Sequence, residues 1–288
     1  MAKPSDAPAW FQAALAHRAH EYVLPDPAGA LAYRCWNPED SDKDALLLAH
    51  GYRAHSRWWD AVAPFLTERF RVYALDFAGM GDSAARQHYD GGEFTANIRS
   101  VLDHAGVERA TLVGHSYGGM RVLRACAEFP QRIAHAIILD SYVAIDDRVI
   151  PRGQSRYGRT EPYPTFEAAM GRFRLLPEQP GESYVREHLG RHSIREVPGG
   201  WNWKFDRALP YALFERDAAA LLAKITVPVD IVCGEHSVVQ SPAHAKRVVA
   251  ALTSSPRVRG PIVIPAAHHH LMIDQPLALV AVLRALLA

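Results

Sequence analysis

The stretch Val113-Gly114-His115-Ser116-Tyr117-Gly118-Gly119-Met120 decides how this chain folds and where its chemistry lies. It follows a short apolar run and precedes a helical one, so a strand ends, a tight Gly-x-Ser-x-Gly turn follows, and a helix begins at once. A serine on such a turn adopts a strained backbone, and the glycines two positions before and after it let strand and helix approach. The turn therefore raises the hydroxyl of Ser116 at the carboxyl end of the strand, where ligands bind in such folds.

Short apolar runs on both sides of this turn predict an α/β fold with a mostly parallel, doubly wound sheet. Each run is closed by glycine or polar residues, and helical stretches such as Glu93 to Ala105 lie between the runs. An antiparallel hairpin between His20 and Trp36 is expected at one edge. The predicted core strands are Ala45–Ala49, Val72–Leu75, Ala110–Val113, Ala136–Leu139, Val229–Val232 and Pro261–Ile264.

The alternation of strand and helix stops between about Tyr142 and Ala223. This stretch is rich in Pro, Gly, Arg and aromatic residues, shows no clear strand, and is too long for a bare loop in a compact domain. We therefore expect a helical cap at residues 142–223, inserted between two parts of the α/β core at residues 1–141 and 224–288. A chain of 288 residues that is 49% hydrophobic can bury a core of this size.

Composition argues against several classes of protein. The formal charge of +1 gives no electrostatic reason to expect nucleic acid or an anionic membrane as a partner. The N-terminal region has no long apolar core, and no stretch reaches the roughly 18 consecutive apolar residues of a membrane span. We therefore expect a cytoplasmic protein with a small-molecule substrate, and the sequence leaves open whether it forms a homo-oligomer.

The cysteines give no sign of a metal site. Cys35, Cys126 and Cys233 are widely spaced and form no CxxC pair, so we expect no zinc site. Cys126 and Cys233 stand in apolar runs and are expected to be small buried hydrophobes. No metal or organic cofactor is predicted.

A serine hydroxyl is a weak nucleophile and needs an adjacent base. The loop after the last predicted strand carries three consecutive histidines, His268, His269 and His270, followed by Pro276 and an apolar helix. The base is expected in this loop. The residues alone do not decide which of the three histidines it is.

Together with the elbow, His50-Gly51-Tyr52 and the stretch from Asp76 to Ser83 make the chain similar to the α/β-hydrolase superfamily over nearly its whole length. It resembles most the capped, serine-type esterases and serine hydrolase-like proteins. In that family the catalytic histidine usually stands seven residues before the proline that opens the last helix, which implies His269. His268 then stands where the family often has glycine, and His268 and His270 are interpreted as packing or supporting neighbours.

The resemblance also implies an oxyanion hole. In the resembling enzymes, the loop corresponding to His50-Gly51 donates one backbone N–H to the oxyanion, and the residue after the nucleophile donates the second. Carried over to this chain, the donors are the amides of Tyr52 and Tyr117. Donors aimed at a developing oxyanion are typically worth about 3 kcal/mol each.

The acid of the expected triad departs from the family's most frequent pattern. The family most often has Gly-x-x-Asp after the seventh strand, whereas this chain has Gly234-Glu235-His236-Ser237. Some members, such as certain haloalkane dehalogenases, place the acid at the end of the sixth strand, where this chain has Asp140, 24 residues after Ser116. A buried aspartate needs a partner, which a histidine N–H would supply. We expect Asp140 to be the acid, with Glu235 as the alternative.

Two aromatic segments have two interpretations each, and one turn has a single interpretation. The aromatic clusters Trp58-Trp59 and Trp201-Asn202-Trp203-Lys204-Phe205-Asp206 either line an apolar substrate pocket or pack the cap against the core. The turn from Asp76 to Ser83 is interpreted as a structural loop near the floor of the site.

These parts predict a serine hydrolase that cleaves a carboxylic ester of a small, largely apolar substrate. Ser116 attacks the carbonyl, His269 takes its proton, Asp140 stabilises the imidazolium, and water releases the acid from the acyl-enzyme. Cleavage of an amide, a lactone or a carbon–carbon bond next to a carbonyl uses the same parts. Two other classes stay open: a cofactor-free dioxygenase on a heteroaromatic substrate, with the His/Asp pair as base, and a ligand receptor with little turnover.

Overall fold

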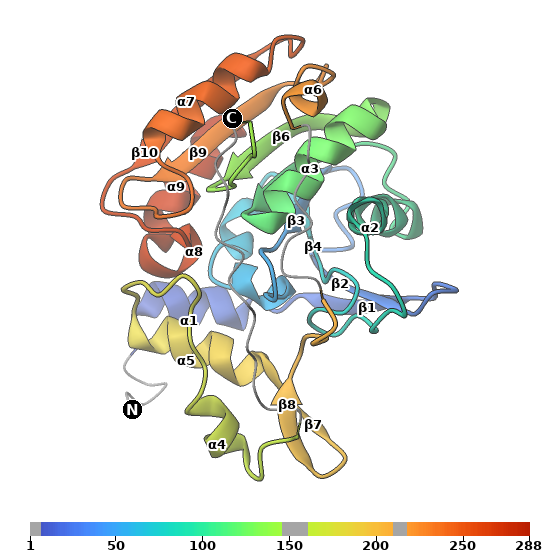
Figure 1. Ribbon diagram of the computed structural model, residues 1–288, viewed down its shortest axis with the longest axis vertical. Helices are drawn as coiled ribbons and strands as arrows, with labels where there is room; N and C mark the ends of the chain where they lie inside the picture. Colours follow the sequence, from blue (N-terminus) through green and yellow to red (C-terminus); the bar gives the residue numbers. More distant parts are fainter. Residues whose placement is uncertain (1–6, 146–160, 210–217) are drawn as a thin grey trace.

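The computed structural model describes residues 7–145, 161–209 and 218–288. Its centre is an eight-stranded sheet in the order β1-β2-β4-β3-β5-β6-β9-β10, shown in Figure 1. β2 pairs antiparallel with β1 and β4, and all other neighbours are parallel, as the sequence predicts. The strands are β1 (His20–Leu24), β2 (Leu31–Trp36), β3 (Asp44–Ala49), β4 (Phe70–Leu75), β5 (Ala110–His115), β6 (Ile133–Leu139), β9 (Val229–Gly234) and β10 (Val258–Ile264).

Helices cover both faces of this sheet, which is why its central strands are apolar on both sides. In β3, Leu47 packs into the core on the face of α2 and α3, whereas Leu46 and Leu48 pack into the core on the face of α8 and α9. All three side chains are fully buried. The helices are α1 (Ala9–Ala16), α2 (Gly91–His104), α3 (Tyr117–Glu128), α4 (Phe166–Met170), α5 (Ser183–His192), α6 (Ala218–Leu222), α7 (Pro242–Ala251), α8 (Leu271–Asp274) and α9 (Pro276–Leu286).

The stretch between β6 and β9 contains α4, α5 and α6, and it also contains an antiparallel hairpin of β7 (Ile194–Val197) and β8 (Gly200–Trp203). Figure 1 shows this hairpin beside α4, at the end of the molecule away from α7. The prediction of a purely helical segment was wrong here. The strands of the hairpin are only four residues long, and they carry charged and aromatic side chains instead of an apolar run. The division into core and cap stays a proposal, since residues 146–160 and 210–217 lie outside the described residues.

The parallel strands all end at the same edge of the sheet, and the loops that follow them carry the predicted site residues. β3 leads to His50, β5 to Ser116, β6 to Asp140, and β10 to the loop that contains His269. Residues from four distant parts of the sequence therefore meet at one edge. In the described part of the chain, no helix is both long enough and apolar enough to cross a bilayer.

Candidate active site

Ser116 lies on a strained elbow between β5 and α3. Its φ of 52° and ψ of −120° place it in a backbone region that residues with side chains rarely adopt. Glycine is needed on both sides of it. A Cβ on Gly114 would lie 2.6 Å from the Cα of Gly119, and a Cβ on Gly118 would lie 2.5 Å from the carbonyl oxygen of Ala49. The elbow has the form expected from the sequence, because strand and helix approach only where side chains are missing.

A buried hydrogen bond joins His269 to Asp140. The Nδ1 of His269 donates to Oδ1 of Asp140 at 2.8 Å, and both side chains are almost wholly buried. The other contacts of the carboxylate are the N–H of Gly234, which donates to Oδ2 at 2.8 Å, and the hydroxyl of Ser237, which donates to Oδ1 at 2.5 Å. A carboxylate only accepts, so Nδ1 carries the ring proton and Nε2 of the neutral imidazole keeps its lone pair.

The backbone of Asp140 is also strained, with a φ of 46°. Of the five non-glycine residues with positive φ in the described ranges, four lie in loops at this edge of the sheet: Arg53, Ser116, Asp140 and Ala266. Such conformations persist only where the surrounding structure holds them, and they gather at functional sites. Backbone strain thus singles out the same edge of the sheet as the side chains do.

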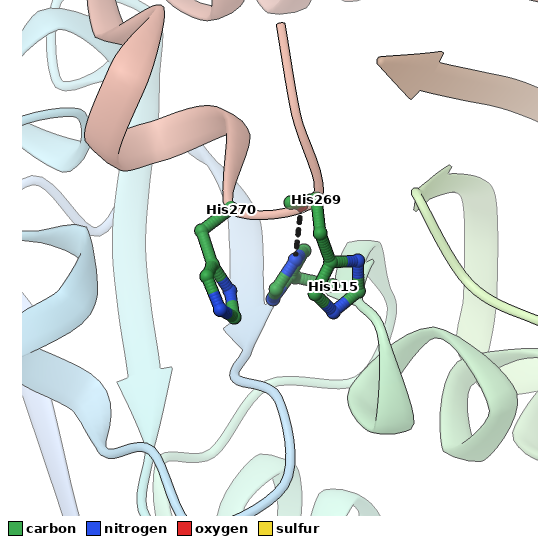
Figure 2. Close-up of side chains that lie close together, drawn as sticks. All are labelled: His115, His269 and His270. Atoms are coloured by element: carbon green, nitrogen blue, oxygen red, sulfur yellow. Dashed lines mark hydrogen bonds between the residues drawn. The ribbon is translucent and has the colours of Figure 1, made fainter. Parts of the chain in front are cut away.

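The three consecutive histidines have three different environments. The ring of His268 binds Oδ2 of Asp274 at 2.9 Å. The backbone N–H of His270 donates to Gln179 at 2.7 Å, and its ring packs edge-on to Trp58. Figure 2 shows the rings of His269 and His270 on either side of His115. Among the three, only His269 contacts Asp140.

Glu235, the alternative acid, forms no hydrogen bond with His269. Its side chain is half exposed, and its carboxylate accepts a hydrogen bond from the N–H of Ala266 at 2.8 Å. Asp140 holds the position next to Nδ1 of His269 instead. The structure therefore pairs the histidine with the carboxylate after β6 rather than with one after β9.

The two predicted oxyanion donors lie on either side of the elbow. Tyr117 is the first residue of α3, where backbone N–H groups point out of the helix and favour negative charge. The loop of Tyr52 passes close by, since a Cβ on Gly51 would lie 3.4 Å from the Cβ of Ser116. The hydroxyl of Tyr52 donates to the carbonyl of Leu209 at 2.9 Å, which ties this loop to the stretch between β6 and β9.

A cavity of about 690 Å³ opens at this point. Ser116, His269, Tyr52 and Tyr117 contribute to its wall, and most of the remaining wall is aromatic or aliphatic, with basic side chains among it. The lining from the stretch between β6 and β9 includes Tyr163, Arg172, Phe173, Arg174, Leu176, Pro177, Ser193, Trp203, Lys204 and Phe205.

Both interpretations of the aromatic clusters hold in part. Trp58 lines the cavity, whereas its neighbour Trp59 is fully buried in the core. In the second cluster Trp203 lines the cavity, whereas Trp201 packs edge-on against Phe166, which also belongs to the stretch between β6 and β9. Each pair thus divides between pocket and packing.

Several histidines at this edge are buried and held neutral. Burial lowers the pKa of His50 to about 4 and lowers the pKa of His55, His115 and His270 well below the ordinary value. His50 is fully bonded in its neutral form, because its Nδ1 donates to the Gly51 carbonyl at 2.7 Å and its Nε2 accepts from the Phe77 N–H at 3.1 Å. The site is therefore surrounded by uncharged imidazoles.

The turn after β4 has the structural role predicted for it. Asp76 is fully buried and accepts hydrogen bonds from the N–H groups of Ser56, at 2.5 Å, and Asp82, at 2.8 Å. Burial raises its pKa to about 6, against the lowering effect of these hydrogen bonds. A Cβ on Gly81 would lie 2.3 Å from this carboxylate, so the turn needs glycine there.

Sequence reasoning assigned no role to two residues that the structure places in the site. Ser237 stands at the family's usual acid position and donates to the relocated acid. A serine in the place of the expected aspartate was the signal for it. His115 precedes the elbow serine, and its Nε2 donates to the backbone carbonyl of His269 at 2.9 Å. Its partner lies 154 residues away, so no local pattern could have indicated this contact.

In sequence, the chain is similar to proteins that are named as hydrolases or esterases. The serine hydrolase-like protein of Danio rerio is 27% identical over 200 residues, which are 64% of this chain and 60% of that protein. The bifunctional esterase/perhydrolase of Acinetobacter calcoaceticus is 33% identical over 125 residues, which are 42% of this chain and 44% of that protein. This chain therefore matches less than two thirds of the length of either relative.

Solved structures agree on the fold. The structure of E-2-(acetamidomethylene)succinate hydrolase matches 94% of this chain and 99% of its own with a TM-score of 0.78, at 20% sequence identity. At that identity the likeness concerns the fold alone. The sequence model of the alpha/beta hydrolase family matches residues 46–282, which include the elbow and the loops that hold Asp140 and His269. The chain belongs to the alpha/beta hydrolase family.

Proposed function

We propose that this protein is a serine hydrolase that cleaves a carboxylic ester, or a related acyl bond, of a small and largely apolar substrate. The observation that carries the proposal is the hydrogen bond of 2.8 Å between His269 and Asp140, beside a cavity that is lined by His269 and by the strained Ser116. A nucleophile, a base and an acid are the parts that acyl transfer requires.

Acylation uses the free lone pair of the base. Ser116 Oγ attacks the substrate carbonyl carbon while Nε2 of His269 takes the hydroxyl proton. The imidazolium that forms is stabilised by Asp140, whose carboxylate is already bonded to Nδ1. When the tetrahedral intermediate collapses, the bond to the leaving oxygen breaks, and Nε2 returns its proton to that oxygen.

The oxyanion of this intermediate lies between the elbow and the loop after β3. In the proposal, the backbone N–H groups of Tyr52 and Tyr117 donate to it, and removal of one such donor typically costs about 3 kcal/mol of transition-state stabilisation. Deacylation repeats the steps with water: Nε2 of His269 takes a proton from water, the hydroxide oxygen attacks the acyl carbon, and Ser116 Oγ leaves with the proton returned by Nε2.

The lining of the cavity supports the substrate class. The volume of about 690 Å³ lies within the usual range for small-molecule sites, roughly 300–1,000 Å³. Aromatic side chains such as Trp58, Phe173, Trp203 and Phe205 form much of the wall. The names of the esterase/perhydrolase and serine hydrolase-like relatives support the reaction class, hydrolysis with a serine nucleophile.

A fluorophosphonate probe tests the proposal. We expect it to label the purified protein once per chain at Ser116, since the probe reacts only with an activated serine. Ser116→Ala should abolish labelling and lower kcat on a small activated ester about 10⁶-fold. Ser241→Ala, which removes only the cap hydroxyl of α7, is the matched control and should do neither. Full esterase activity in Ser116→Ala would refute the assignment.

Oxygen consumption by the wild type and by Ser116→Ala tests the alternative that the protein is a dioxygenase. The pairing of His269 with Asp140 is the one observation in its favour, because such enzymes use a His/Asp pair as base. A dioxygenase would consume oxygen with a heteroaromatic substrate and would keep that activity in Ser116→Ala. We expect no oxygen consumption.

A further inference from the structure

Three buried histidines form a cluster beside the elbow. One ring nitrogen each of His115, His269 and His270 lies within 4.8 Å of the other two. Figure 2 shows the ring of His115 between the other two rings, and the ring centroids are 4.6 to 5.6 Å apart. All three residues line the cavity, and none is more than 5% exposed. The rings are therefore reachable from the cavity but shielded from bulk water.

Hydrogen bonds determine which nitrogens have a lone pair to offer. Nε2 of His115 faces the backbone carbonyl of His269 and must carry the proton, so Nδ1 has the lone pair. Nδ1 of His269 carries the proton toward Asp140, so Nε2 has the lone pair. The ring of His270 has the backbone of Leu176 as its one polar partner in the described part of the chain, so the other ring nitrogen has a lone pair available.

We propose that His115, His269 and His270 bind a divalent transition-metal ion, with Zn²⁺ as the best match. Neutral imidazole is a ligand that zinc, copper and nickel share, and three histidines plus one open position form a common zinc geometry. Asp140 accepts a hydrogen bond from Nδ1 of His269 and so orients its ring. In many zinc sites a carboxylate orients a histidine ligand in the same way, through the ring nitrogen that does not bind the metal. The prediction that there is no metal site was based on the spacing of the cysteines. It did not include this cluster, because His115 is far from His269 and His270 in the sequence.

Modest side-chain movement completes the site. Zinc–nitrogen bonds of about 2.0–2.1 Å in a tetrahedron require nitrogens about 3.4 Å apart, so the rings must close by roughly 1 Å. His270 is the least constrained of the three, because neither of its ring nitrogens is held by a carboxylate or by a short hydrogen bond in the described part of the chain, and rotation of this ring supplies the approach. Because the three residues line the cavity, water there could supply a fourth ligand.

The metal would inhibit the proposed reaction. It would occupy Nε2 of His269, the atom that takes the proton of Ser116 in the proposed mechanism. This consequence rests on the proposed function, whereas binding itself does not. Zinc is therefore expected to inhibit ester hydrolysis reversibly, and chelation with EDTA should restore it.

Calorimetric titration of the metal-free full chain with ZnCl₂ tests the binding. We expect one zinc ion per chain. His270→Gln should raise the Kd at least tenfold, and Asp140→Asn should raise it about 10- to 100-fold, as loss of a carboxylate behind a histidine ligand does in known sites. His268→Gln is the matched control: its ring binds Asp274 outside the cluster, so the Kd should not change.

A second histidine pair provides the discriminating variant. His188 and His192 lie one turn apart on α5, with ring centroids separated by 4.4 Å, and could also chelate zinc. His192→Gln should leave the Kd unchanged. Absence of stoichiometric zinc binding, or wild-type affinity in His270→Gln, or loss of binding in His192→Gln, would each overturn the proposal.

Two further measurements do not depend on whether variants fold. Crystals of the wild-type protein soaked in ZnCl₂ should show an anomalous peak between the three rings, and a peak only elsewhere would refute the site. Ser116→Ala should bind zinc as tightly as the wild type although it is inactive. If the wild type proves to have no esterase activity but binds zinc in the cluster, the proposed function fails and the metal site stands. If esterase activity is present and saturating zinc does not reduce it, the metal inference fails alone.

Discussion

Two buried histidine–aspartate pairs lie at opposite ends of the same strands. At the carboxyl ends, His269 binds Asp140 at 2.8 Å beside the cavity. Near the amino ends of β6 and β9, His135 binds Asp230 at 2.7 Å, and Arg259 of β10 binds the same carboxylate at 2.7 and 2.6 Å. By the histidine–aspartate distance alone the two pairs are indistinguishable.

The two pairs differ in what neutralises the carboxylate. Burial acts to raise the pKa of Asp230, but hydrogen bonds from His135 and Arg259 outweigh it and hold that pKa below its ordinary value. No lysine or arginine of the described segments forms an ion pair with Asp140, whose other partners are the N–H of Gly234 and the hydroxyl of Ser237. The charge of Asp140 thus remains available to an imidazolium at His269. A histidine–aspartate pair suggests catalysis only where no lysine or arginine forms an ion pair with the aspartate and where a nucleophile lies near the histidine.

Among changes to the two histidine–aspartate pairs, removing the charge of Asp140 should have the largest effect. Asp140→Asn keeps the size of the side chain but presents the wrong partner to Nδ1 of His269, and we expect kcat on an activated ester to fall about 10⁴-fold. Glu235→Gln, the matched change on the alternative acid, should leave kcat within about twofold. Steady-state kinetics on both variants decide the question, and the opposite ranking would move the acid to Glu235.

Acid should destabilise the carboxyl-end site, since its buried histidines are neutral in the folded state. A histidine whose pKa is depressed on folding binds fewer protons folded than unfolded, so stability is full above pH 6.5 and falls as pH decreases toward the folded pKa. For His50, a shift from 6.5 to about 4 corresponds to about 3 kcal/mol. His55, His115 and His270 act in the same direction, and Asp76, with its raised pKa, acts in the opposite one.

Urea unfolding at pH 7, 6 and 5 measures this dependence. We expect the unfolding midpoint to fall steadily, and His50→Gln to reduce the slope relative to a His17→Gln control. An unfolding free energy that is constant over this range would contradict the neutral state of these histidines.

The pair at the amino ends should matter for stability and not for turnover. Asp230→Asn leaves Arg259 without its charge partner, and breaking a buried pair costs about 3–5 kcal/mol. Because the Arg259 side chain is 37% exposed, we expect a smaller loss in unfolding free energy, about 2 kcal/mol. Values of kcat measured below the unfolding transition should stay within about twofold of the wild type. A large loss of kcat with unchanged stability would make the two pairs functionally alike.

The smallest effect should come from Ser237, which positions the acid. Ser237→Ala removes one of three donors to Asp140, and we expect kcat to fall roughly tenfold, as loss of a hydrogen bond to a charged group would give. KM should change little, because Ser237 does not line the cavity. Ser237→Thr keeps the hydroxyl and should recover most of the activity. Ser255→Ala is the matched control, since that hydroxyl donates to the carbonyl of Val227 at the far ends of the strands. Equal kinetics in Ser237→Ala and wild type would remove its positioning role.

The sequence by itself determined the local parts of this protein. The apolar runs predicted the parallel core strands, and the Gly-x-Ser-x-Gly pattern predicted the elbow, because strand propensity, helix start and glycine clearance act over a few neighbouring residues. Spacing within the resembling family indicated His269 and Asp140 as candidates. These inferences needed no knowledge of which strands are neighbours.

Only the tertiary structure decided which side chains meet. The choice among His268, His269 and His270 depends on how one loop faces β6, and the bond to Asp140 spans 129 residues. The contact of Ser237 with Asp140 also joins distant parts of the chain. So does the contact of Arg259 with Asp230, which distinguishes the second histidine–aspartate pair from the first. Side-chain pairing of this kind follows from the alignment of distant strand ends, and a linear pattern of residues carries no record of that alignment.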